Sequence, residues 1–176
     1  MAFGTLLLRT TVGGLFIGHG LQKLTGAFDG PGLEGATGFM ASLGIHPPRQ
    51  NAIAAASAET FGGAALVLGL ATPAAAAALI ASMTTAVRKV HLQNGVWNAG
   101  GGWEFNAVLA AAAAAIAADG PGPISVDALF HRSHWGIAGG LFAIAAGVAG
   151  SYAVTEYSKR AAPSETAAED DPTASA

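Results

Sequence analysis

Five long apolar stretches most constrain the fold of this chain. They cover about residues 3–23, 50–70, 73–91, 104–118 and 135–154. The hydrocarbon core of a bilayer is about 30 Å thick, and an α-helix needs about 20 apolar residues to cross it. Inside lipid every backbone polar group must be satisfied within the protein, which favours helices over open strands. The sequence therefore predicts an all-α membrane protein with five spanning helices.

The expected domain organisation follows from these stretches. Residues 1–130 are predicted to form a bundle of four membrane helices, and residues 131–157 to add a peripheral fifth transmembrane helix. Residues 158–176 are polar and acidic, which predicts a disordered tail. In the long loop of residues 24–49, apolar positions from Leu33 to Leu43 indicate a short interfacial helix, and Pro47–Pro48 indicates the start of the next helix.

Composition excludes several classes of function. Charged residues make up 11% of the chain, and there is no cysteine. Thiol chemistry and iron–sulfur ligation within this chain are therefore excluded. The sequence has no basic stripe and no aromatic stacking platform, so no nucleic-acid partner is expected. Arg9 and His19 interrupt the first apolar stretch, and we interpret it as a spanning helix rather than a signal peptide.

Ionisable residues inside the apolar stretches are the main candidates for a site. A charge within a membrane costs free energy, so it usually marks a functional site or a structural ion pair. If successive spans alternate in direction, most of these residues lie near one membrane face, with Glu59 roughly 13 Å below it. The residues concerned are Arg9, His19, Lys23, Glu59, Arg88, Lys89, His91 and Glu104.

We divide these candidates by their chemistry. The predicted catalytic residues, which can exchange protons, are Glu59, His19 and His91. The predicted substrate-binding residues are Arg9, Lys23, Arg88 and Glu104. No close-spaced pair of metal ligands occurs, so no metal site is predicted.

Each assignment has a structural alternative. Arg9 and Glu59 could form a buried ion pair that fixes the register of two helices. Lys23 could extend toward the membrane surface while His19 bonds a neighbouring helix. We expect Arg9 and Glu59 to lie close together, with His19 or His91 beside the same cavity.

Other charged residues carry structural interpretations. Arg88 and Lys89 could be charges that set topology rather than ligands of an anion. Ser125 and Asp127 are predicted to cap a helix or a turn. Lys159–Arg160 follows the fifth stretch, which predicts a cytoplasmic C-terminus.

An ordered series of short motifs runs along the first four apolar stretches. Leu8-Arg9 is followed by the run Gly13 to Leu24, then by Glu59 with Gly62-Gly63 and the run Leu66 to Leu70. Met83, His91, Glu104, the run Gly120 to Pro123 and the run Ser125 to Asp127 complete the series, which covers residues 6–128. This series resembles the DoxX family of small bacterial membrane proteins, and the fifth stretch and the tail lie outside the resemblance.

The resemblance implies a four-helix membrane bundle in the bacterial inner membrane. The family name derives from a likeness to a subunit of a thiosulfate:quinone oxidoreductase, and some members are linked to oxidative-stress complexes. It thus suggests a component of a membrane redox system that acts with quinone or sulfur compounds, with quinone as the expected cofactor.

Two other classes of function remain open from the sequence. The chain could be a non-catalytic anchor for soluble redox enzymes, or a small transporter of lipids or solutes. The expected partners are the lipid bilayer, soluble redox enzymes and further copies of the chain.

Overall fold

The computed structural model describes residues 2–162, and within them it is entirely helical. The long helices are α1 (Ala2–Thr25), α3 (Pro48–Leu68), α4 (Thr72–Ala86), α5 (Glu104–Asp119) and α7 (Gly136–Arg160). Two shorter α-helices are α2 (Gly32–Ser42) and α6 (Val126–Leu129). After α4 come a π-helical turn η1 (Val87–His91) and two 3-10 turns, η2 (Leu92–Asn94) and η3 (Asn98–Gly100). The predicted tail lies outside the described residues from position 163 onward.

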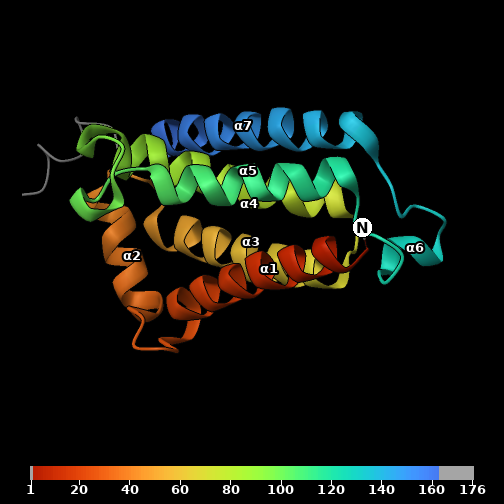
Figure 1. The fold of residues 1–176 in the computed structure, drawn as a ribbon. Helices are drawn as coiled ribbons and strands as arrows, with labels where there is room; N and C mark the ends of the chain where they lie inside the picture. Colours follow the sequence, from red (N-terminus) through yellow and green to blue (C-terminus); the bar gives the residue numbers. More distant parts are fainter. Residues whose placement is uncertain (1, 163–176) are drawn as a thin grey trace, which may run out of the picture.

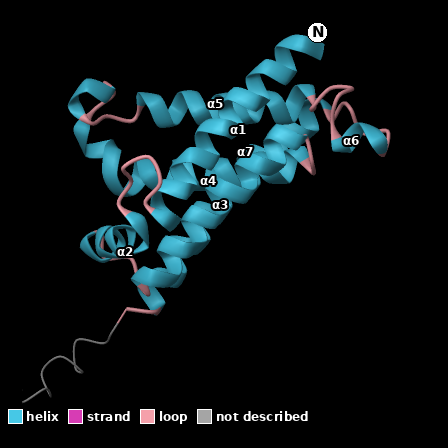
Figure 2. Ribbon diagram, turned by 90° about the horizontal axis from the view of Figure 1, so that it is seen from below, coloured by secondary structure: helices cyan, strands magenta, loops and turns pink. Residues whose placement is uncertain are grey.

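The five long helices lie side by side, as Figure 1 shows. The short helix α2 stands across one end of the bundle, and α6 lies at the other end, in the connection between α5 and α7. In Figure 2 the helix α2 again lies at the edge of the bundle, beside α3. The ends of α1, α4 and α7 and the start of α3 all lie at the α2 end.

Several helix boundaries confirm the sequence prediction. Pro48 occupies the first turn of α3, where its missing N–H costs nothing and its fixed φ suits a helix. Gly69 ends α3 in a left-handed conformation (φ 63°), which glycine adopts without steric cost. Glu104 opens α5, and α2 matches the interfacial helix expected between Leu33 and Leu43.

Helix α7 lies at one side of the bundle, where it packs against α4 and α5. The glycines on its inner face allow this approach: a Cβ at Gly147 would lie 2.6 Å from a side-chain carbon of Ile80, and one at Gly140 would lie 2.8 Å from Ala118 Cβ. The helix also continues to Arg160, beyond the predicted boundary at residue 157, with Glu156 paired to Lys159 and Arg160 in its last turns.

Two of the predicted spans, α3 and α7, are long and apolar enough to cross a membrane. The apolar core runs between α1, α3, α4 and α5, where Phe16, Leu66, Leu79 and Ile116 are fully buried. A second cluster of alanines with Ile80 joins α4, α5 and α7. The small alanine side chains of this second cluster allow the backbones of α4, α5 and α7 to approach closely.

Candidate functional site

A cavity of about 790 Å³ lies at the α2 end of the bundle. Its apolar wall is built from alanines of α3 and α4, from Phe39 and Met40 of α2, and from Leu43, which follows α2. Polar groups interrupt this wall at few places. Five of the candidate residues proposed from sequence line this one cavity, namely His19, Lys23, Glu59, Lys89 and His91. The expectation that a histidine lies beside the same cavity as Glu59 is therefore confirmed.

An ion pair between α1 and α3 forms the polar centre of this cavity. Lys23 Nζ lies 2.5 Å from Glu59 Oε2, and the Ser82 hydroxyl of α4 donates to Glu59 Oε1 at 2.7 Å. Only 4% of the Glu59 side chain is exposed, against 29% for Lys23. Both carboxylate oxygens of Glu59 are thus engaged, and the three residues tie three helices together.

The expected pairing of Arg9 with Glu59 is wrong, because the register of α1 against α3 separates them. A Cβ at Gly13 would lie 2.6 Å from the Gly63 carbonyl oxygen, so the two backbones touch at this level. A Cβ at Gly69 would collide with Arg9 Nη1, which places Arg9 beside the C-terminal end of α3. Glu59 lies ten residues before Gly69, or about 15 Å along the helix.

Arg9 instead belongs to a buried group of contacts at the α6 end. Its guanidinium donates to the Ile124 carbonyl, while Nε and Nη1 have no hydrogen-bond partner among the described residues. Asp127 is near enough to interact with it electrostatically. Arg9 is therefore far from the cavity and is not among its lining residues.

Asp127 caps the start of α4 from a distant part of the chain. Its carboxylate accepts hydrogen bonds from Ala71 N (2.8 Å), Thr72 N (2.9 Å), the Thr72 hydroxyl (2.8 Å) and the Trp135 indole (3.3 Å). Burial acts to raise the pKa of Asp127, but these hydrogen bonds, the Thr72 bonds foremost, outweigh it and lower the pKa. The prediction that Ser125 and Asp127 cap helices is confirmed, since Ser125 Oγ also accepts from Ala128 N in α6.

The two histidines are held by different helices. His19 Nδ1 lies 3.2 Å from Gln22 Oε1, and its ring packs edge-on against Phe105 of α5 at 6.4 Å between centroids. His91 Nδ1 donates to the Gly101 carbonyl at 2.7 Å. In a neutral His91 this bond leaves Nε2 as an acceptor. Both rings are half-buried and line the cavity.

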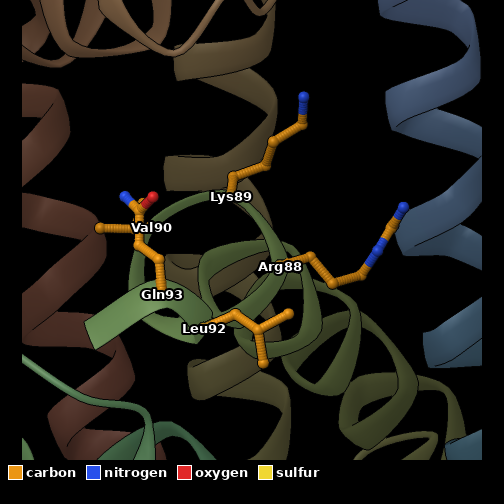
Figure 3. A pocket seen from close by; sticks show the side chains of 5 residues that line it. All are labelled: Arg88, Lys89, Val90, Leu92 and Gln93. Atoms are coloured by element: carbon orange, nitrogen blue, oxygen red, sulfur yellow. The ribbon is translucent and has the colours of Figure 1, made fainter. Parts of the chain in front are cut away.

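The neighbouring residues Arg88 and Lys89 have different surroundings, as Figure 3 shows. Arg88 reaches α7, where its guanidinium stacks on the Tyr152 ring at 3.6 Å and donates to Ser151 at 3.1 Å and Thr155 at 3.4 Å. Lys89 extends in another direction and lines the cavity. Both residues border a smaller depression of about 260 Å³ at the π-helical turn, but Arg88 does not line the large cavity. Its contacts make it a link between η1 and α7.

Glu104 stabilises the loop before α5. Its Oε1 accepts a hydrogen bond from Asn98 N at 2.7 Å, and Glu104 does not line the cavity. Within residues 2–162, no group of three His, Cys, Asp or Glu residues lies close enough together to hold a metal ion.

Sequence reasoning missed five polar contributors to the cavity. They are Asn51, Ser82, Thr85, Asn98 and Asn106, and Asn106 Nδ2 also lies 3.5 Å from Met83 Sδ. Asn51 and Asn106 were detectable as polar residues near the start of apolar stretches. Ser82 carried no such signal, because serine is common in membrane helices and only the packing of α4 brings it to Glu59.

Comparison with known proteins matches residues 4–92 to the family described as DoxX. The chain belongs to the DoxX family. The matched DoxX region runs from α1 through η1 and so contains both members of the Lys23–Glu59 ion pair. DoxX is a family of membrane proteins, so this chain is a membrane protein with helical spans. No curated protein and no solved structure matches it.

Proposed function

We propose that this DoxX protein is a component of a membrane redox system that binds a quinone-like lipid in the cavity at the α2 end. All five long helices would cross the bilayer, four as a bundle with α7 packed against it. The observation that carries the proposal is a large apolar cavity with a buried ion pair in its wall, because ligand pockets combine apolar walls with a few placed polar groups.

The lining residues fit a quinone-like molecule. The Lys23 ammonium has three N–H donors and uses two of them on Glu59 and the His19 carbonyl, so the third can donate a hydrogen bond to a polar ring substituent. His19 and His91 can give or take a proton at that ring. Phe39 of α2 and the following Leu43 can cover an apolar tail, as both line the cavity. A quinone supplies the electron-transfer chemistry that a chain without cysteine lacks.

The orientation follows from the charges at the α2 end. Lys23, Arg49, Lys159 and Arg160 all belong to helix ends on this side of the bundle. An excess of lysine and arginine favours the cytoplasmic side, so we propose that the cavity and the C-terminus face the cytoplasm of a bacterial cell. Soluble redox partners would then have access to the loop of residues 92–103.

A pair of matched variants tests the proposal. Ala78 lines the cavity, whereas Ala74, one turn earlier in α4, is exposed on the outside. Lipid extracted from the purified full-length protein is analysed by mass spectrometry for quinones, and binding of an alkylated naphthoquinone is titrated. We expect Ala78→Phe to weaken binding at least about tenfold because the ring fills the cavity. Ala74→Phe serves as the control and should bind normally.

The outcomes separate this function from its alternatives. If no quinone copurifies and the naphthoquinone binds neither the wild type nor the control, the proposal is overturned. Retention of a soluble enzyme that is unaffected by Ala78→Phe would instead favour the role of a membrane anchor.

A further inference from the structure

The charges lining the cavity do not balance. Lys23 and Glu59 neutralise each other at 2.5 Å. Lys89 also lines the cavity, but among residues 2–162 it has no ion pair and no hydrogen-bond partner. With the histidines neutral, the wall carries one net positive charge, which belongs to Lys89.

The π-helical turn explains why Lys89 takes this position. A π-turn widens the helix by one residue, and such turns often occur at functional sites. Arg88 is held on α7 by the Tyr152 ring and the Ser151 hydroxyl. With its neighbour fixed there, Lys89 extends in a different direction, as Figure 3 shows.

An unpaired ammonium beside apolar walls favours a ligand of opposite charge. Removing an ammonium from water costs free energy unless a counter-ion or a set of hydrogen bonds compensates it. Phe39 and Met40 of α2 and the following Leu43 line the same cavity and offer contact for a hydrocarbon chain. The combination fits a molecule with a negative headgroup and an apolar tail.

We propose that the cavity binds anionic amphiphiles, with Lys89 as the counter-ion of the headgroup. This inference rests on the proposed function only in that the same cavity must accept a lipid-like molecule. The ligand class is a carboxylate or a phosphate attached to a hydrocarbon chain. Lys89 is the residue that selects this class.

Matched probes test the role of charge. Binding of oleate and of oleyl alcohol, which share a chain and differ in headgroup charge at neutral pH, is titrated on the full-length protein in nonionic detergent. We expect oleate to bind at least about tenfold more tightly, since a hydrogen bond to a charged group is stronger than a neutral one. Sodium acetate, which has the anion without the chain, should not displace oleate.

Variants of nearby cations identify the residue responsible. Lys89→Gln should abolish the preference for oleate and leave oleyl alcohol binding within about twofold, because only the charged contact is lost. Lys89→Arg should retain the preference. Arg49→Gln is the control, since Arg49 is exposed at the same end of the bundle and does not line the cavity.

The possible failures are distinguishable. Equal binding of the two probes to the wild type, or an unchanged preference in Lys89→Gln, overturns this inference alone. Displacement of oleate by acetate at equal concentration would show a site for free anions and overturn the amphiphile class. Absence of binding for both probes and for the naphthoquinone would overturn the proposed function as well.

Discussion

Lys23 Nζ and Glu59 Oε2 lie 2.5 Å apart and join α1 to α3 in the wall of the cavity. The two side chains differ in their access to solvent, since 29% of Lys23 and 4% of Glu59 is exposed. The Glu59 carboxylate is therefore buried, whereas part of the Lys23 side chain remains accessible. The Ser82 hydroxyl donates a hydrogen bond to the other carboxylate oxygen. Each oxygen of Glu59 therefore has a partner as long as Lys23 remains in place.

This asymmetry predicts unequal costs when one partner is removed. Lys23→Leu should destabilise the protein by about 3–5 kcal/mol because it leaves the buried Glu59 charge unpaired. Glu59→Leu should cost less, about 1–3 kcal/mol, because Lys23 can reach solvent. The double variant should recover much of the loss. Thermal unfolding in detergent measures all three, with Lys159→Leu as an exposed control, and a harmless Lys23→Leu would contradict the pairing.

The contact between α1 and α3 predicts opposite effects at two neighbouring glycines. Gly13→Ala should destabilise the protein by about 1–3 kcal/mol, because the new Cβ would lie 2.6 Å from the Gly63 carbonyl oxygen and 2.7 Å from Val67 Cγ2. Gly14→Ala places its Cβ where no atom lies within 4 Å. It should be neutral or stabilising by up to about 1 kcal/mol, since alanine is the better helix former. Equal effects on the unfolding temperature would show that the register is different.

The lowered pKa of Asp127 predicts acid sensitivity at the α6 end. A carboxyl group whose pKa is lower in the folded state stabilises the fold above its unfolded pKa of about 3.9. That stabilisation is lost as the pH falls from about 4 through the lowered pKa. Unfolding temperatures measured across this range should decline for the wild type. Asp127→Asn should be less stable at neutral pH and lose this part of the pH dependence, whereas an unchanged pH profile would contradict the assignment.

The polar C-terminal residues are predicted to be dispensable. Truncation after Arg160 removes a segment with no apolar face and keeps the Glu156 pairs of the last helical turn. We expect unchanged expression and unfolding temperature, measured beside the full-length protein. A large loss of stability would reveal a docking contact of this segment.

Local sequence signals predicted most of the helix boundaries. Pro48 starts α3, Glu104 starts α5, and the apolar residues after Pro31 form α2. Such signals act within a turn or two of the residue that carries them, so they can be interpreted without the rest of the fold. The packing of α7 could not be predicted in this way. Its glycines allow a close approach only because alanines and Ile80 of other helices lie opposite them, and the sequence does not show which residues lie opposite.

The sequence by itself determined that this is a helical membrane protein of the DoxX family, and which ionisable residues its helices carry. Only the tertiary structure decided that Glu59 pairs with Lys23, that Arg9 lies with Asp127 at the other end, and that Lys89 is left unpaired. The physical reason is that periodicity fixes the face on which a side chain lies but not its depth. Depth depends on how far one helix slides along another, and here the backbone contact between Gly13 and Gly63 sets that distance.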